Sequence, residues 1–320
     1  MLSGIQPSGT LHLGNYFGMM SRMIRYQKEN DLFSFIVNYH AMTTIQDPSI
    51  LENNTINAAL DFIALGLDPE KSTFWIQGDV SQVTEFTWII SNVTNVGLIE
   101  RSTSYKDKIS KGITPNMGLF SYPILMASDI LCFGGDIVPV GKDQKQHLEM
   151  TRDIAIKFNN TYGETLVVPE PDIEQETQLV PGIDGQKMSK SYNNTIPIFG
   201  DEKFIRKQIM SIVTDSTPVA EPKDIKSPLF QLFILFLDEK GKKDLKERFL
   251  SPGLQYGDVK KELFETIIEY FRPFREKREY LSGHMDYVYE QLLNGSNKAS
   301  AVADQILSKV RKVTGLNYKV

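Results

Sequence analysis

Short, nearly continuous apolar runs separated by helical patterns dominate the first half of the chain. "LFSFIV" spans 32–37, and "STFWIQ" (72–77) and "DIVPV" (136–140) are similar. Runs without polar alternation are typical of strands covered on both faces of a parallel sheet. The spacing between these runs predicts helices over 15–29, 49–65, 82–96 and 145–158. This alternation predicts an α/β fold with a doubly wound, Rossmann-like parallel sheet.

The second half of the chain has a different pattern. From about Asp201 onward the apolar residues follow helical spacing, and Gly295 and Gly315 stand where helix C-caps are expected. A length of 320 residues also favours two domains. We therefore expect a Rossmann-like catalytic domain over 1–197 with inserted helices, and a helical domain over 198–320 whose last helix can pack back on the first domain.

Composition excludes several classes of protein. A net charge of −5 argues against a general nucleic-acid coat, although it permits a local basic surface. The single cysteine, Cys132, excludes an intramolecular disulfide and a cysteine-based zinc or iron–sulfur site. The most apolar segment, 229–237, is too short to span a bilayer, and no basic leader precedes an apolar stretch. We expect a cytoplasmic protein without membrane association.

A glycine-rich turn, "QPSGTLHLGN", separates a predicted strand over 2–5 from a helical pattern that begins at Tyr16. Such a turn places backbone N–H groups at the positive end of a helix, which binds phosphate. His12 adds a donor that can stabilise developing negative charge, and Gly14 lets a base or ribose lie against the backbone. The alternative is an ordinary turn with a structural histidine.

A second motif, "QKMSKS", occupies 186–191 after a loop rich in turn residues. Lys187 and Lys190 stand three residues apart, with small hydroxyl residues between and after them. Lysine is a flexible point charge that suits a polyphosphate whose charge is being redistributed. The alternative is a solvated basic loop.

Together, "HLGN" and "KMSKS" resemble the two signature motifs of class I aminoacyl-tRNA synthetases. The resemblance implies that His12, Asn15, Lys187 and Lys190 are catalytic. It further implies an ATP site, in which Lys106 and Lys111 are alternatives to Lys108. The implied ATP-binding residues are Gln6, Pro7, Ser8, Gly14, Asn15, Lys108, Gly141, Lys142, Asp143, Lys187, Met188, Ser189, Lys190 and Ser191.

The segment "SYPILMASDIL" predicts a pocket wall. Its helix is expected to start at Pro123 and to stop at Gly134–Gly135. Tyr122, Met126 and Asp129 are then spaced to share one face. A buried carboxylate is costly without a partner, but it would accept a hydrogen bond from an indole N–H, which is only a donor. The alternative is that Asp129 is exposed or caps a helix.

The longer order "SGIQPSG", "YP-LMA-DIL" and "DIVPVG-DQ-QHLE-TRDIA" resembles bacterial tryptophanyl-tRNA synthetases over most of the first domain. The resemblance implies activation of tryptophan by ATP with release of pyrophosphate, and then transfer to tRNA(Trp) by a homodimer. Mg²⁺ would arrive with ATP, without a dedicated protein site. The implied tryptophan-binding residues are Asp129, Tyr122, Met126, Gln144, His40, Val138, Val140 and Gln6.

Three other functions stay open at this point. A tyrosyl-tRNA synthetase would share both signature motifs, a tryptophan sensor would keep the pocket without catalysis, and a small-molecule adenylyltransferase would share the nucleotide-binding turn. The chain also departs from the usual pattern at Lys142, where many relatives are acidic, at Asn38–Tyr39 and at Leu2.

A basic series marks the helical half. Arg272, Arg275 and Arg278 recur every three residues around Pro273, which is expected to bend its helix. They could follow a tRNA backbone or form a solvated face.

Overall fold

The computed structural model describes residues 1–7, 9–102, 106, 109, 112, 114–139, 144–172 and 180–318. Strands β1 (Leu2–Ile5), β2 (Phe33–Ile36) and β3 (Thr73–Ile76) form a parallel sheet in that order. Strand β4 (Ile137–Pro139) pairs in parallel with β5 (Glu170–Asp172) and lies beside β1. The predicted parallel α/β sheet is confirmed. Strand β5 was not predicted, because its residues form no apolar run.

Alternate residues of the central strands enter two separate hydrophobic cores. Phe35 and Trp75 belong to one core and stack with ring centroids 4.8 Å apart, whereas Ile36 and Phe74 belong to the other. Both faces of the sheet are therefore covered, which is why the strands read as continuous apolar runs.

The helices of the first half differ from the predicted ranges mainly at their ends. The predicted helix over 15–29 is wrong as a single element, because the chain forms three successive segments that start earlier and end at Tyr26. The predicted helix over 82–96 is also too long, since the chain turns at 92–95 between two helices. The helices of this half are α1 (Leu13–Asn15), the π-helical η1 (Tyr16–Met20), α2 (Ser21–Tyr26), α3 (Asn38–Ala41), α4 (Pro48–Ala64), the short 3₁₀ turn η2 (Gln77–Asp79), α5 (Gln82–Ser91), α6 (Val96–Glu100), α8 (Met117–Leu131) and α9 (Lys145–Tyr162).

Helix α8 starts at Met117, so the prediction that Pro123 is its first residue is wrong. The side chain of Asn116 accepts a hydrogen bond from the Leu119 N–H at 2.8 Å and caps the helix. A side-chain cap satisfies donors that the helix start leaves unpaired, and Pro123 follows inside the helix. The predicted stop lies close to the observed one, because α8 ends at Leu131 and Gly134 has a φ of 61°.

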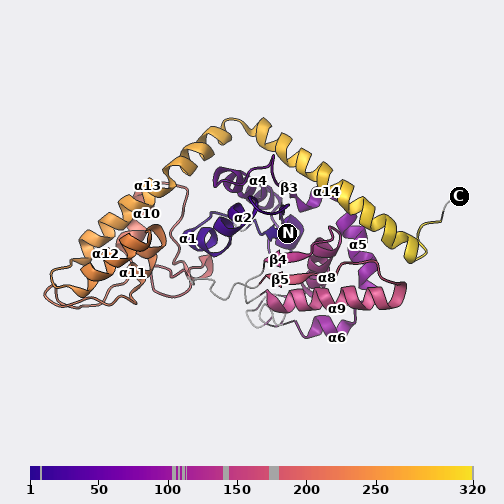
Figure 1. The fold of residues 1–320 in the computed structure, drawn as a ribbon, viewed down its shortest axis with the longest axis horizontal. Helices are drawn as coiled ribbons and strands as arrows, with labels where there is room; N and C mark the ends of the chain where they lie inside the picture. The colour runs from indigo at the N-terminus through magenta and orange to yellow at the C-terminus, as the bar shows by residue number, and fades with distance from the viewer. Residues whose placement is uncertain are drawn as a thin grey trace.

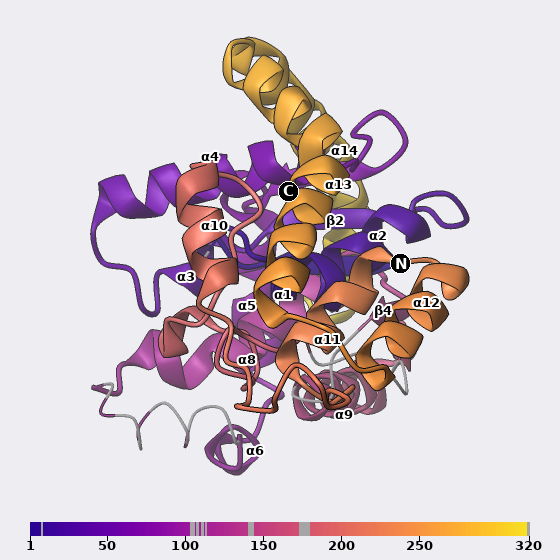
Figure 2. The ribbon, with the colours of Figure 1, turned by 90° about the vertical axis from the view of Figure 1, so that its left-hand side faces the viewer.

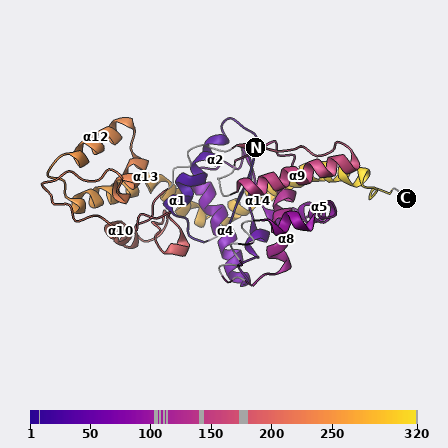
Figure 3. The same ribbon diagram turned by 90° about the horizontal axis from the view of Figure 1, so that it is seen from below.

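The second half is helical, as predicted: residues 180–318 contain no strand longer than an isolated bridge. Its elements are the 3₁₀ turn η3 (Lys190–Tyr192), α10 (Glu202–Met210), α11 (Pro228–Phe233), the 3₁₀ turn η4 (Ile234–Phe236), α12 (Glu239–Leu250), α13 (Tyr256–Ser282) and α14 (Met285–Val313). The long helices α13 and α14 meet at an angle at the top of the view in Figure 1. Helices α10, α12 and α13 gather at one end of the molecule, and α5, α8 and α9 lie toward the other (Figure 3). The end with α10, α12 and α13 faces the viewer in Figure 2.

Gly295 lies inside α14, so its prediction as a C-cap is wrong. The helix crosses β3 there so closely that a Cβ on Gly295 would stand 1.8 Å from the Phe74 carbonyl oxygen. Helix α14 thereby covers a strand that stands last in its three-stranded sheet, which shields an edge open to pairing. Gly315 does follow the helix end, with a φ of 78°. No helix within the described ranges is long and apolar enough to cross a membrane.

Candidate active site

The glycine-rich turn and the 187–191 loop meet in the structure, although they are far apart in sequence. The Leu13 N–H donates to the Ile196 carbonyl at 3.0 Å, and the Ile198 N–H donates to the Leu11 carbonyl at 3.1 Å. The Gly14 N–H donates to the Met188 sulfur at 3.3 Å. The first signature motif is therefore bonded to the second through the Met188 side chain, and to the segment that follows the second motif through backbone hydrogen bonds.

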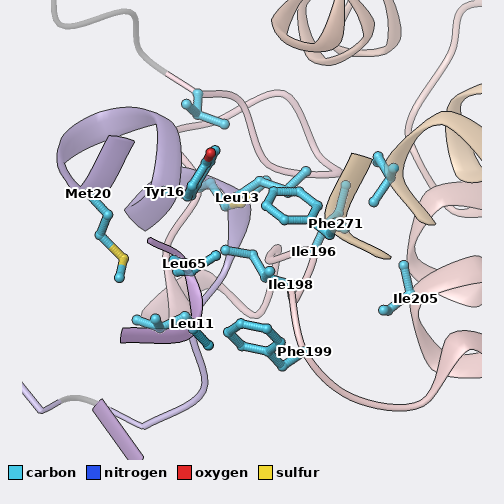
Figure 4. Close-up of a cluster of buried hydrophobic side chains, with 14 of the residues drawn as sticks. Leu11, Leu13, Tyr16, Met20, Leu65, Ile196, Ile198, Phe199, Ile205 and Phe271 are labelled. Carbon is cyan, nitrogen blue, oxygen red and sulfur yellow. The ribbon is translucent and has the colours of Figure 1, made fainter. Parts of the chain in front are cut away.

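A cluster of buried hydrophobic side chains packs beneath this junction (Figure 4). It contains buried side chains from the turn and from the segment after the loop: Leu11, Leu13, Ile196, Ile198 and Phe199. Such packing holds the backbone of both motifs in a fixed relative position.

His12 is buried in the turn, and its environment keeps it neutral. Burial, together with the positive charge of Lys190, lowers the pKa of His12 to about 4. Its Nδ1 has no hydrogen-bond partner among the described residues, and it lies 3.0 Å from the position of a Cβ on Gly14. The Asn15 side chain accepts from the His12 N–H at 3.1 Å and so fixes the turn. The imidazole can therefore act as an uncharged donor.

The lysines of the loop stand at the surface of this site. Lys187 is exposed, and Lys190 keeps contact with solvent although partial burial of its ammonium group lowers its pKa. The Lys190 Nζ lies 3.8 Å from the position of a Cβ on Gly9, whose φ of 86° is easily adopted by glycine. Lys190 therefore reaches back to the glycine-rich turn.

Asn194 shapes the loop, and sequence analysis missed it. This buried amide accepts from the Ser189 N–H at 2.8 Å and donates to the Asp184 carboxylate at 2.8 Å and to the Lys187 carbonyl at 3.1 Å. Gly182 makes room for it, because a Cβ there would stand 2.3 Å from the Asn194 side chain. Nothing in the sequence distinguishes this asparagine from the one before it.

Asp129 is only 3% exposed, which excludes the alternative that it is a surface or capping residue. Its Oδ1 accepts from the Gln77 Nε2 at 2.7 Å, and its Oδ2 lies 2.7 Å from the His40 Nε2. The predicted residues His40 and Asp129 are thus brought together, while Gln77 was missed. Gln77 in turn accepts from the Tyr39 N–H at 3.0 Å, which orients its amide toward Asp129.

The unusual Asn38–Tyr39 pair joins two strand ends. The Asn38 side chain accepts from the Gly78 N–H at 2.9 Å, and the Tyr39 hydroxyl donates to the Gly78 carbonyl at 3.4 Å. The turn after β2 is thereby bonded to the turn after β3. This position, at the carboxyl ends of parallel strands, is where open α/β sheets bind ligands.

Tyr122, on the same helix as Asp129, makes a further polar contact near this cluster. Its hydroxyl lies 2.6 Å from the Nε2 of His147, a buried residue of α9 that sequence analysis missed. The rings of Tyr122 and His40 stand edge to face with centroids 6.2 Å apart. Burial raises the pKa of Tyr122, so its hydroxyl stays protonated near neutral pH.

The remaining predicted site residues differ in their burial. Met126 is half-buried beside the hydrophobic core that contains Phe35 and Trp75, and Val138 is buried within that core. Gln144 precedes α9, and Gln6 is exposed directly after β1 while Pro7 is buried. Met188 is buried, and Ser189 and Ser191 lie on the loop. The predicted residues Ser8, Lys108, Val140, Gly141, Lys142 and Asp143 lie outside the described residues.

The three arginines of α13 make contacts within the chain. Arg272 pairs with Glu269, Arg275 donates to the Gly200 carbonyl at 2.7 Å, and Arg278 pairs with Asp61. All three line a cavity of about 430 Å³. The described part of the chain contains no group of three or more acidic, histidine or cysteine side chains placed to hold a metal ion.

Comparison with known proteins agrees with this geometry. The family model of class I tRNA synthetases (W and Y) matches residues 1–272. The tryptophan–tRNA ligase of Fusobacterium nucleatum subsp. nucleatum is 52% identical over 98% of this chain and 97% of its own. The Campylobacter jejuni tryptophanyl-tRNA synthetase, crystallised with ADP and tryptophan, is 49% identical and superimposes with a TM-score of 0.94 over 98% of this chain and 99% of that one. The chain therefore belongs to the bacterial class I tryptophanyl-tRNA synthetases.

Proposed function

We propose that the junction of the glycine-rich turn with the 187–191 loop is where this tryptophan–tRNA ligase joins tryptophan to ATP. In this reaction a carboxylate oxygen of tryptophan attacks the α-phosphorus of ATP, the bond to the bridging oxygen breaks, and pyrophosphate leaves. No protein nucleophile is needed, so catalysis depends on positioning and on stabilisation of charge. The observation that carries the proposal is the contact between the two motifs, in which the Gly14 N–H donates to the Met188 sulfur and the Lys190 Nζ lies 3.8 Å from the position of a Cβ on Gly9.

The turn offers ATP one backbone donor in particular. The Leu13 and Asn15 N–H groups donate to backbone carbonyls, whereas the Gly14 N–H donates to the Met188 thioether. A thioether is a weak acceptor, so we infer that a phosphate oxygen takes its place. His12 then donates to the phosphates without bringing a charge of its own, and Lys187 and Lys190 neutralise the leaving pyrophosphate. Mg²⁺ would enter with ATP, held by the phosphates.

For tryptophan, the proposed pocket lies at the ends of β2 and β3. Each oxygen of Asp129 has one hydrogen-bond partner among the described residues, and a carboxylate oxygen can accept more than one hydrogen bond. The indole N–H would be a further donor to Asp129. Tyr122 and Gln144 would hold the amino acid's charged groups, and the side chains of Met126, Val138 and His40 would pack around the ring.

Tryptophan-dependent ATP–pyrophosphate exchange is the experiment that tests this function. We expect exchange with tryptophan and none with tyrosine. Asp129→Asn should raise the KM for tryptophan roughly 5- to 150-fold, because replacing the carboxylate weakens hydrogen bonds worth about 1–3 kcal/mol. Exchange with tyrosine would contradict the assigned specificity. A folded protein that binds tryptophan without any exchange would be a sensor.

The helical residues 198–320 are proposed to form the tRNA-binding domain, with residues 1–197 forming the catalytic one. This division is supported by the absence of strands in the described residues after β5 and by the three long helices that follow Ser227. Since the arginines of α13 are held by contacts within the chain, the exposed lysines of α12 are better placed for a tRNA backbone. We expect the reaction to take place in the cytoplasm.

A homodimer is also proposed, through the face formed by α5, α6 and α8. Large apolar side chains are exposed on each of these helices: Trp88, which is 73% exposed, Val96 and Met117. Helix α8 contacts both of the others, so the three side chains belong to one helical unit. Exposed aromatic residues of this kind often mark interfaces.

Trp88→Glu is expected to convert the dimer to a monomer, because it places a charge in an apolar interface. Analytical ultracentrifugation at micromolar concentration would measure the change. Leu293→Glu adds the same charge to a side chain of α14 that is 59% exposed, and it should leave the dimer intact. A Trp88→Glu protein that sediments like the parent dimer would show that the interface lies elsewhere.

A further inference from the structure

A buried amide lies at the end of β3, and the proposed function assigns it no role. Gln77 is the first residue of η2 and is only 1% exposed. A buried side-chain amide costs free energy unless its N–H and carbonyl groups are hydrogen-bonded. Here the Nε2 donates to the Asp129 Oδ1 at 2.7 Å, and the Oε1 accepts from the Tyr39 N–H at 3.0 Å. The Gln77 amide is thus held at both of its ends.

The orientation of this amide follows from the chemistry of its partners. A backbone N–H only donates, so the Tyr39 N–H must meet the amide oxygen, and the amide nitrogen then faces Asp129. The reversed amide would place an oxygen against the Asp129 carboxylate and a donor against the Tyr39 N–H. Because the Nε2 carries only donors, the Asp129 Oδ1 is held as an acceptor. The Tyr39 N–H therefore selects the one orientation in which Gln77 donates to Asp129.

The turn that carries Gln77 is also held through the residue that follows it. The Gly78 N–H donates to the Asn38 side chain at 2.9 Å, and the Gly78 carbonyl accepts from the Tyr39 hydroxyl at 3.4 Å. A Cβ on Gly78 would stand 3.0 Å from the Asn38 Nδ2, so glycine lets the two turns approach this closely. The turn after β2 therefore fixes both the backbone next to Gln77 and the direction of its side chain.

Asp129 is the residue on which these contacts act. Its carboxylate is buried on α8, with Gln77 bonded to Oδ1 and the His40 Nε2 2.7 Å from Oδ2. The last torsion of an aspartate side chain has a broad range, and a partner on each oxygen narrows it. A carboxylate has about four lone-pair sites, so sites remain for a further donor. Their direction is set jointly by Gln77 and His40.

We propose that Gln77 is a positioning residue for tryptophan recognition, which holds Oδ1 of Asp129 and so aims the remaining lone pairs of this carboxylate at the indole N–H. This inference rests on the proposed function, in which Asp129 accepts from that N–H. Without the amide, the carboxylate turns toward His40, its other partner in the described part of the chain, and the indole N–H meets a poorly aligned acceptor. A site built to hydrogen-bond a substrate N–H rejects analogues that lack it, so Gln77 contributes to specificity as well as to affinity.

Gln77→Met tests this role, because methionine has a similar length and no amide. We expect the KM for tryptophan in ATP–pyrophosphate exchange to rise about 10-fold, since a misaligned acceptor loses most of a hydrogen bond to a charged group. The kcat at saturating tryptophan and the KM for ATP should change little. Benzothienylalanine, in which sulfur replaces the indole N–H, needs no acceptor, so its inhibition constant should change far less. The ratio of the two affinities, which measures the preference for tryptophan, should therefore fall.

Gln27→Met is the matched control, because Gln27 is a half-buried amide with a similar pair of contacts. It accepts from the Asp68 N–H at 2.8 Å and donates to the Gly66 carbonyl at 2.8 Å. Both contacts precede β3, whereas Gln77 follows it, so this variant should keep the preference for tryptophan. Circular dichroism would confirm that each variant is folded. Should Gln77→Met fail to fold, Gln77→Asn tests the same point, since its amide is one methylene shorter and cannot reach both partners, and an unchanged KM for tryptophan would contradict the inference.

The outcomes distinguish this inference from the proposed function. If the parent chain binds benzothienylalanine as tightly as tryptophan, the proposed role of Asp129 is wrong, and the inference fails with it. If the parent chain prefers tryptophan and a folded Gln77→Met keeps that preference, the inference about Gln77 alone is overturned. An equal loss of preference in Gln27→Met would overturn it as well, because the effect would then follow from general loosening of the fold.

Discussion

His12→Ala is expected to reduce kcat/KM for ATP in tryptophan-dependent exchange roughly 10²- to 10³-fold, the usual effect of removing one donor that stabilises developing charge. His12 is buried beside Gly14 and near Lys190, and its Nδ1 has no partner among the described residues. Because the pKa of His12 is about 4, its neutral form predominates above pH 5, and we expect no loss of rate from His12 between pH 8 and 5. Exchange kinetics over this range would measure both effects.

Two comparisons make the His12 result specific. His12→Gln keeps an N–H donor and should retain more activity than His12→Ala. His284→Ala changes an exposed histidine after α13 and should leave kcat unchanged. An active His12→Ala protein with parental kinetics would show that the turn binds ATP through its backbone alone.

The lowered pKa of His12 also makes stability depend on pH. The folded protein binds the His12 proton only near pH 4, whereas the unfolded chain binds it near pH 6.5. Between these two pH values the unfolded state therefore binds more protons than the folded state. The free energy of unfolding then decreases as the pH falls from 6.5 to 4. His12→Ala should flatten that part of the stability profile in urea unfolding.

Gly295→Ala is expected to destabilise the fold by more than about 3 kcal/mol, because overpacking against backbone cannot be relieved by a rotamer change. The new Cβ would stand 1.8 Å from the Phe74 carbonyl oxygen, so α14 would have to lift from β3. Thermal unfolding would show a melting temperature lower by roughly 6 °C or more for a chain of this size.

Gly257→Ala is the matched control, since Gly257 lies in α13 and a Cβ there meets nothing within 4 Å. Replacing a glycine by alanine in open helical surroundings stabilises by up to about 1 kcal/mol. The two identical substitutions should therefore act in opposite directions. Equal melting temperatures for both variants would mean that α14 does not pack on β3 as described.

Local patterns were sufficient for several features of this protein. The run over 32–37 identified a strand covered on both faces, because its apolar side chains alternate between two cores, and even the one polar residue, Ser34, is fully buried. The spacing of Tyr122, Met126 and Asp129 placed them on one helix, and the two signature motifs identified the synthetase class. Each of these properties depends on residues close together in sequence, or on residue types that the chemistry requires.

Other features depend on contacts between segments far apart in sequence, which local pattern does not predict. Local pattern left Asp129 either exposed or buried, and it is buried because Gln77 and His40 arrive from the ends of two strands. Gly295 was predicted to end a helix, but it lies inside α14 at the point where this helix packs on β3. Residue type and spacing determine which elements form, whereas the partner of a buried polar group is determined by packing. Local pattern is therefore sufficient for the class of this synthetase and for most of its helices and strands, whereas packing determines which side chains its pocket brings together.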